Sequence, residues 1–307
     1  MKKMKKYISL LLSAAMVAAM TAGCGSSTTS DTKDTSTASA STEAAANESG
    51  TESTGTSTEV QVTPPSDLVE SGKLTYAVAA TFAPYEYADE DGNYVGFDIE
   101  MAKAMADLMG LDVEIMEMDF NGLISALQGD RCDIINSAMY IKPEREEQVD
   151  FVKYMYIGDT ILVRAGNDLN IQSTDDLSGK TVAVTAGAVE ELTCEAFNED
   201  FESRGMDPST ILQLPTSNDA VVAVQNAQAD CMVYSAASAA YAMSQQPGVF
   251  ETTTVFDTDT VIGIATRKGD TEMQEAIQKC LDILVENGTY DSLMEKYNLA
   301  SDLSYFK

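Results

Sequence analysis

The feature that most constrains the fold of this chain is a short sequence pattern that occurs twice, 97 residues apart. Residues 126–133 read Ala-x-Gln with an Asp five positions after the Gln, and residues 223–230 repeat that spacing. A Gly-Lys pair stands before the first strand of each half, at 72–73 and at 179–180. Because the two copies of the pattern are 97 residues apart, the 307 residues are expected to contain two similar lobes rather than one small domain.

Strand-like and helix-like segments alternate from residue 72 onward, which is the pattern of an α/β fold. The strands are predicted at 73–79, 113–115, 134–135, 181–185, 211–214 and 231–234. The helices are predicted at 97–109, 123–127, from 190, and over 221–227, 271–287 and 289–297. Ligands of such sheets gather outside the carboxyl ends of the strands, so a cleft between the two lobes is the expected site.

The N-terminus has the pattern of a targeting segment. Residues 1–6 are basic, residues 8–20 are mainly apolar, and small residues precede Cys24. This pattern resembles the lipobox of bacterial lipoproteins, although Thr21 stands where leucine is usual. We predict a signal peptide over 1–23 and a lipid on Cys24 that anchors the chain outside the membrane, with an ordinary signal peptide as the alternative. A spanning helix is disfavoured because the apolar run is shorter than the ~20 residues a bilayer requires.

Residues 24–66 are predicted to be a disordered tether. Of the 35 residues from 25 to 59, 19 are Ser or Thr, and none is aromatic. Such a segment does not bury enough apolar surface to offset the entropy lost on ordering. The tether would connect the lipid anchor to the folded lobes.

The composition excludes several classes of function. The sequence has 49 acidic and 19 basic residues and no histidine. Loss of the four lysines in residues 1–23 leaves a net charge near −34, which repels the phosphate backbone of nucleic acids. The lack of histidine removes the commonest general base and the commonest metal ligand. We therefore expect no nucleic-acid partner, no metal and no cofactor.

Four cysteines fall in the predicted lobes: Cys132, Cys194, Cys231 and Cys280. Outside the membrane they are able to pair within a lobe, Cys194 with Cys231 and Cys132 with Cys280. Their spacing does not indicate zinc, and free buried thiols are favoured over disulfides.

Seven short stretches match a known pattern in order and spacing. They are 82–86 (FAPYE), 96–98 (GFD), 120–124 (FNGLI), 139–145 (MYIKPER), 149–151 (VDF), 263–265 (GIA) and 286–290 (ENGTY). Over residues 72–298 the chain resembles the polar-amino-acid (family 3) solute-binding proteins of ABC importers. The resemblance implies an α/β, periplasmic-binding-protein-like type II fold, with lobe 1 at 72–157 plus 262–307 and lobe 2 at 158–261. It also implies a hinge of two crossings, near 156–160 and 257–261, and a monomer that delivers its ligand to a permease and its ATPase.

The resemblance places the ligand's carboxylate on Arg145, whose planar guanidinium is suited to bidentate binding. The alternative is a surface arginine paired with Glu146 or Asp150. Phe82 and Phe120 fall on the aromatic walls of the family's site, where they would hold an apolar or cationic group, unless they are plain core residues.

Several positions depart from the family pattern. An acidic residue after the first strand is replaced by Ala79, and the acid that pairs the ligand's α-ammonium is replaced by Ser235. Glu190, Glu191 or aromatic faces would then have to compensate the ammonium. The implied ligand-binding residues are Arg145, Phe82, Phe120, Tyr140, Ala138, Thr185, Ala188, Val189, Tyr234 and Ser235. The backbone N–H groups of 187–189, at a helix start, are expected to be available to an anionic ligand group.

Three functions are consistent with this reading. The favoured one is transport, in which the chain captures an amino acid or a related small carboxylate. A ligand-sensing module is the first alternative, because similar lobes occur in receptors. A dehydratase-like enzyme is the second, although the chain shows no activated serine or cysteine. The sequence leaves open whether the ligand is an amino acid, a modified amino acid, a small carboxylate or an aromatic metabolite.

Overall fold

The computed structural model describes residues 60–307. The predicted signal peptide, Cys24 and the tether up to residue 59 lie outside the described residues. Within the described part, no helix is long and apolar enough to cross a membrane.

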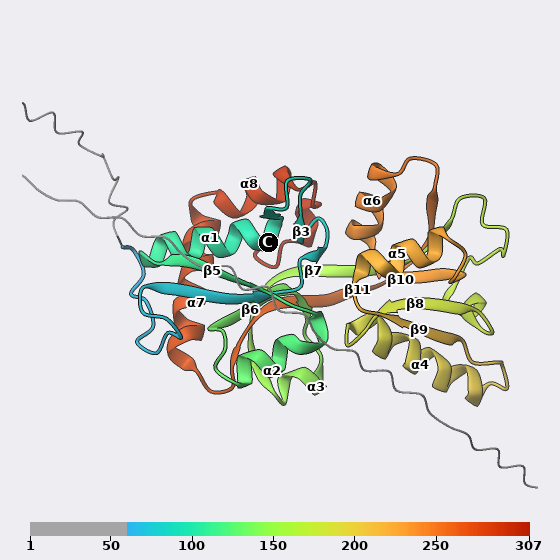
Figure 1. The fold of residues 1–307 in the computed structure, drawn as a ribbon, viewed down its shortest axis with the longest axis horizontal. Coiled ribbons are helices and arrows are strands. Elements are labelled where there is room, and N and C mark those ends of the chain that lie inside the picture. Colours follow the sequence, from blue (N-terminus) through green and yellow to red (C-terminus); the bar gives the residue numbers. More distant parts are fainter. Residues whose placement is uncertain (1–59) are drawn as a thin grey trace, which may run out of the picture. The chain divides into compact units, whose positions relative to one another are not determined.

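An eight-stranded mixed sheet has the strand order β5-β1-β6-β11-β7-β10-β8-β9 (Figure 1). Its middle is the antiparallel pair β7 (Val149–Arg164) and β11 (Phe250–Arg267). Parallel strands flank this pair on each side. The β1 half contains β5 (Asp112–Glu117), β1 (Lys73–Val78) and β6 (Ile134–Tyr140), and the β8 half contains β10 (Cys231–Ser235), β8 (Thr181–Thr185) and β9 (Thr210–Leu214).

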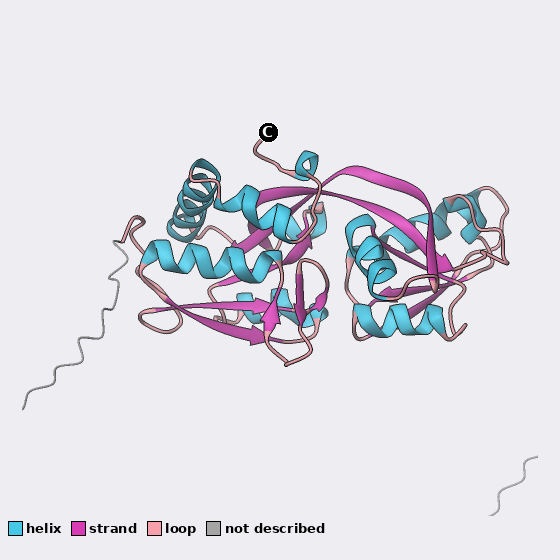
Figure 2. Ribbon diagram, turned by 90° about the horizontal axis from the view of Figure 1, so that it is seen from above, coloured by secondary structure: helices cyan, strands magenta, loops and turns pink. Residues whose placement is uncertain are grey.

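Helices accompany each half, and the long strands β7 and β11 run from one group to the other (Figures 1 and 2). The helices of the β1 half are α1 (Phe97–Met109), α2 (Leu123–Gln128), α3 (Pro143–Glu146), α7 (Thr271–Glu286) and α8 (Thr289–Lys296). Those of the β8 half are α4 (Val189–Ser203), α5 (Ser217–Gln225) and α6 (Ala236–Gln245). The predicted α/β class and the predicted alternation of strands and helices are confirmed. A small second sheet, β2 (Thr81–Phe82), β3 (Glu86–Ala88) and β4 (Tyr94–Val95), was not predicted.

The sequence repeat corresponds to a repeated structural brace. The Asp133 carboxylate accepts a hydrogen bond from the Thr75 N–H at 2.8 Å, and its own N–H donates to the Thr75 carbonyl at 2.7 Å. Asp230 makes the same two contacts with Thr181, both at 2.8 Å. Asp133 therefore ties β1 to the segment that connects α2 with β6, and Asp230 ties β8 to the segment that connects α5 with β10.

Replacing Asp133 with alanine is expected to lower the free energy of unfolding by about 2 kcal/mol, since hydrogen bonds to charged groups contribute ~1.5–3 kcal/mol. The carboxylate is fully buried and also accepts from the Val69 N–H at 2.8 Å, so its loss leaves two backbone donors unpaired. The half-buried Asp230, which braces one such donor, is the matched control. Urea unfolding should therefore show a larger loss for Asp133→Ala than for Asp230→Ala, and equal losses would contradict the account.

The pairing of β7 with β11 is interrupted where the two crossings are predicted. Its register shifts between Phe256 and Thr260, and Asp257 has a positive φ of 52°. Such irregularity is a natural place for bending. The hinge itself stays a prediction.

The folded part begins earlier than the predicted end of the tether at residue 66. Val62 is buried, and the N–H groups of Gln61 and Val62 both donate to the carbonyl of Leu108 at the end of α1. Ser66 donates to the carboxylate of Glu272 through both its N–H and its hydroxyl, each at 2.9 Å. These contacts join the segment 61–66 to α1 and α7.

All four cysteines of the described residues are buried and free. Burial raises the pKa of each thiol, to about 11 for Cys132 and about 12 for Cys231 and Cys280. Among the described residues neither Cys194–Cys231 nor Cys132–Cys280 forms a disulfide, so the favoured alternative of free buried thiols agrees with the structure.

Candidate functional site

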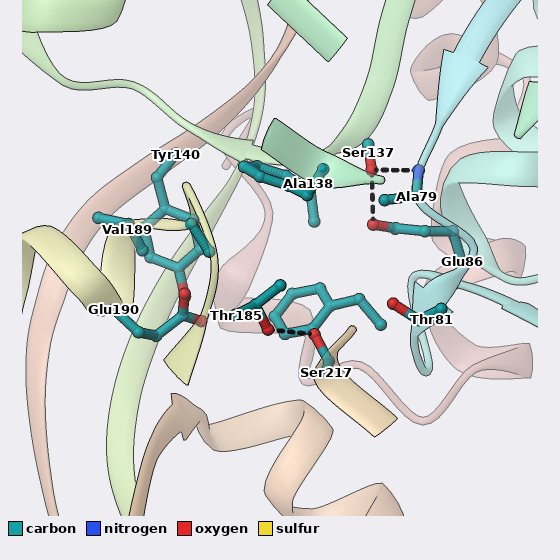
Figure 3. A pocket seen from close by; sticks show the side chains of 13 residues that line it. Ala79, Thr81, Glu86, Ser137, Ala138, Tyr140, Thr185, Val189, Glu190 and Ser217 are labelled. Atoms are coloured by element: carbon teal, nitrogen blue, oxygen red, sulfur yellow. Dashed lines mark hydrogen bonds between the residues drawn. The ribbon is translucent and has the colours of Figure 1, made fainter. Parts of the chain in front are cut away.

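A cavity lies at the carboxyl ends of β1, β6 and β8, where the argument from sheet geometry places a ligand. It holds about 360 Å³ of space between atoms, part of it open to solvent. The β1 half contributes Ala79, Thr81, Phe82, Glu86, Phe120, Ser137, Ala138 and Tyr140. The β8 half contributes Thr185, Ala188, Val189, Glu190 and Ser217 (Figure 3).

Seven of the ten sequence-implied residues line this cavity: Phe82, Phe120, Ala138, Tyr140, Thr185, Ala188 and Val189. Three do not, and these are Arg145, Tyr234 and Ser235. The structure thus brings most of the set to one place, from elements on both halves of the sheet.

Arg145 lies directly behind the cavity wall. It is 5% exposed, and its Nη1 donates to the Tyr140 carbonyl at 2.9 Å. Its Nη2 donates across the two halves to the Gly187 carbonyl at 3.1 Å, and its guanidinium carbon lies 5.3 Å from the centroid of the Phe120 ring. Burial lowers the pKa of Arg145, while the negative charge of Glu190 acts in the opposite direction. The alternative of a surface arginine is therefore wrong.

The aromatic side chains at the cavity are held in place by neighbouring residues. The Phe82 ring stacks on Tyr85 with centroids 5.4 Å apart and meets the edge of Tyr234 at 5.5 Å. Tyr234 is buried, so it supports Phe82 from behind rather than facing the cavity. The hydroxyl of Tyr140 donates to Asp159 Oδ1 at 2.6 Å, which fixes the ring at the cavity edge.

Ser235 has a structural role as the N-cap of α6. Its hydroxyl caps α6, accepting from the Ser238 N–H at 3.1 Å and donating to the Ser238 hydroxyl at 2.8 Å. It is fully buried and outside the cavity lining, so it does not take the place of a carboxylate. Asp159 stands opposite Ser235 in the pairing of β7 with β10.

Glu190, rather than Glu191, faces the cavity. Glu191 accepts from the Gly187 N–H at 2.7 Å and from the side-chain amide of Gln213. Glu190 is 4% exposed, and burial raises its pKa to about 8. The charge of Asp159 raises that pKa further, while its own N–H and Arg145 lower it.

The expectation that the N–H groups of 187–189 are available is wrong for two of the three. The Gly187 N–H is taken by Glu191, and the Ala188 N–H donates to the Thr185 carbonyl at 3.1 Å. Glu191, in the first turn of α4, thus satisfies the first of these donors from within the chain.

Glu86 lines the cavity, although the sequence analysis did not assign it to the site. Its Oε1 accepts from the Ser137 hydroxyl at 3.0 Å, and that hydroxyl in turn accepts from the Ala79 N–H at 3.1 Å. Burial, together with the negative charge of Asp98, raises the pKa of Glu86 well above its usual range. Thr81, Ser137 and Ser217 were missed as well; the Ser217 hydroxyl lies 3.0 Å from that of Thr185. Only the position of Glu86 within the stretch 82–86 signalled its importance.

A family model for bacterial extracellular solute-binding proteins, family 3, matches residues 74–300 of the chain. The chain belongs to this family. It is 32% identical over 232 residues to the arginine-binding extracellular protein ArtP of Bacillus subtilis (strain 168), covering 74% of this chain and 88% of that protein.

Solved structures agree with this assignment. An ancestral arginine-binding protein bound to arginine is 35% identical with a TM-score of 0.69, covering 74% of this chain and 98% of that one. The ancestral amino acid-binding protein AncCDT-1, a precursor of cyclohexadienyl dehydratase, is 34% identical with a TM-score of 0.65, covering 74% and 95%. The predicted family and the two-lobe type II fold class of the solute-binding family are thereby confirmed.

Proposed function

We propose that this solute-binding protein captures an amino acid outside the membrane and delivers it to the permease and ATPase of an ABC importer. The observation that carries the proposal is the cavity at the strand ends, with Arg145 buried behind its wall. A buried guanidinium with N–H groups beyond the two it gives to the Tyr140 and Gly187 carbonyls supports capture of a carboxylate. The arginine-binding relatives support the view that this carboxylate belongs to an amino acid.

The α-ammonium of such a ligand needs an anionic partner, because burial without one is costly. Glu190 lies in the first turn of α4 and lines the cavity, so we assign this role to it in place of Ser235. The assigned ligand-binding set is then Arg145 and Glu190 with walls from Phe82, Phe120 and Tyr140.

The domain arrangement and the membrane attachment are part of the same proposal. The segments 72–157 with 262–307 would form lobe 1, and 158–261 would form lobe 2, closing on the ligand as the hinge bends. A lipid on Cys24 would keep the monomeric chain at the membrane surface near its permease. Mass spectrometry of the exported chain tests this attachment, since Cys24→Ser should remove the lipid and release the protein.

A ligand screen tests the function. Purified full chain is heated with L-amino acids, with amines that lack the carboxylate, and with acids that lack the amine. A ligand at 100 times its dissociation constant should stabilise the protein by about 2.7 kcal/mol. We expect a shift in melting temperature with one or more L-amino acids and none with the matched amines. Shifts with none of the L-amino acids would overturn the proposal.

Two further measurements separate transport from its alternatives. Loss of the chain should abolish cellular uptake of the identified amino acid; unchanged uptake would favour a sensor. Chromatography of the ligand after long incubation should return it unaltered, whereas a new product would favour an enzyme, the alternative to which AncCDT-1 relates.

A further inference from the structure

The two halves of the sheet also touch outside the ligand cavity, through a pair of tyrosines. Tyr87 lies on β3, with the β1 half, and Tyr241 lies on α6, with the β8 half (Figure 1). Their ring centroids are 5.4 Å apart, and the ring planes are inclined at 50°. Within residues 60–307 one other aromatic contact joins the halves, that of Phe82 with Tyr234, and Phe82 lines the cavity. Neither Tyr87 nor Tyr241 does.

Tyr241 is the only aromatic residue of α6, which reads AASAAYAMSQ. Its neighbours on the same surface, Ala237, Ala240 and Ser244, are small, and with residues of the β1 half they line a hollow of about 500 Å³, part of it open to solvent. None of the residues that line this hollow lines the ligand cavity. Because the other side chains there are short, the ring of Tyr241 is the part of α6 that reaches an aromatic partner in the other half.

Tyr87 is fixed within its own half. It lies on the central strand of the small sheet, opposite Thr81 of β2 and Val95 of β4, and its side chain is half-buried. Pairing on both sides leaves the backbone of Tyr87 little freedom to follow a movement of α6. The contact with Tyr241 is therefore lost when the two halves separate.

We propose that Tyr87 and Tyr241 are positioning residues for ligand binding, whose contact holds the two halves together around an amino acid that neither of them touches. The inference rests on the proposed capture of an amino acid and on closure of the halves around it. The apparent affinity for a ligand scales with the fraction of the protein in its binding-competent form, so a contact made only in that form strengthens the binding of every ligand alike. It acts mainly by slowing dissociation, because the halves have to part before the ligand leaves.

Binding to the full-length Tyr241→Ala variant tests the inference. The probes are L-arginine and L-glutamine, which differ in side-chain charge, joined by any other L-amino acid that raises the melting temperature of the wild type. Calorimetry should show binding weakened about 3- to 20-fold, by the same factor for each probe that the wild type binds. A rapid-filtration chase of the radiolabelled probe should show the dissociation rate raised by that factor, with the association rate changed less than about twofold.

A double-mutant cycle identifies the contact as the cause. Tyr87→Ala should weaken binding by a factor similar to that of Tyr241→Ala. The double variant should bind at most about twofold more weakly than either single variant, because each single change already removes the whole contact. Losses that multiply in the double variant would overturn the inference.

Two controls accompany the cycle. Tyr241→Phe keeps the ring, so its affinities should lie within about twofold of the wild type. Tyr94→Ala removes a half-buried tyrosine of the adjacent strand β4, which packs against the core of its own half. Any loss of stability in this variant should leave the affinities for the probes unchanged.

The failure of this inference is distinct from failure of the proposed function. Three results would overturn the inference alone: unchanged affinities in Tyr241→Ala, unequal losses among the probes, or a lowered melting temperature with an unchanged dissociation rate. A wild-type chain that binds no L-amino acid would overturn both.

Discussion

The Arg145→Ala variant is expected to bind its amino acid about 2–5 kcal/mol more weakly, a roughly 30-fold to several-thousand-fold loss of affinity. The physical reason is that the ligand carboxylate stays buried while its cation is gone. The contact of Nη2 with the Gly187 carbonyl adds to the effect, because it joins the two halves of the sheet beside the cavity. Calorimetry against the best ligand of the screen measures the loss.

Two controls make this result specific. Arg131→Ala removes an exposed arginine of the same half and changes the net charge equally, so its affinity should match the wild type. Arg145→Lys keeps the charge but loses the planar fork of the guanidinium. Its affinity should therefore lie between that of the wild type and that of Arg145→Ala. If Arg145→Ala retained near-wild-type affinity with an unchanged melting temperature, Arg145 would not be the carboxylate anchor.

The second large effect is expected from Gly96→Ala, which should destabilise the fold by roughly 2–6 kcal/mol. About 1–3 kcal/mol comes from backbone strain, because Gly96 has φ 129° and ψ 169°, a conformation essentially restricted to glycine. About 1–3 kcal/mol comes from overpacking, since an added Cβ would lie 2.2 Å from the Tyr85 carbonyl oxygen and 2.9 Å from Glu86 Cα. Both neighbours are backbone atoms, which relax little.

Gly92→Ala separates the two contributions. Gly92 also has a positive φ, of 81°, but an added Cβ there meets nothing within 4 Å. Urea unfolding should show a loss near 1 kcal/mol for Gly92→Ala, from strain alone, and a clearly larger loss for Gly96→Ala. Equal losses of unfolding free energy would mean that the close contact with the Tyr85 backbone contributes nothing to the effect of Gly96→Ala. Because the contact also reaches Glu86, ligand affinity of any folded Gly96→Ala protein should fall as well.

Local patterns predicted the elements that carry a clear period. The helix over 97–109 and the strand over 181–185 were predicted with those bounds. Their signals, the spacing of apolar residues and a glycine that ends the helix, depend only on residues close together in the sequence. The strand β11 was missed. Its segment from Glu251 to Val261 has no buried residue, so no apolar alternation marks it, and its pairing with β7 decides its conformation.

The site was harder to predict where the role of a side chain depends on residues far away in the sequence. Ser235 was assigned to the site, yet it caps α6, whose few buried residues give no apolar stripe to announce a helix. Glu86 was not assigned, because its direction depends on the Ser137 hydroxyl, 51 residues away in the sequence. Arg145 was singled out through its motif, but its contact with the Gly187 carbonyl arises only when the two halves meet.

The order of the strands has a consequence for how the chain assembles during export. The β8 half, with α4, α5 and α6, comes from one continuous stretch, 181–245. The β1 half comes first in the chain, yet β6 acquires its neighbour β11 only from residues 250–267, and α1 acquires α7 from residues 271–286. A chain that emerges N-terminus first therefore acquires most elements of its middle before those of its beginning. Loss of the last sixty residues would take β11, α7 and α8 from the earliest part, whereas the middle would lose only the first part of β11, with Phe250 and Phe256.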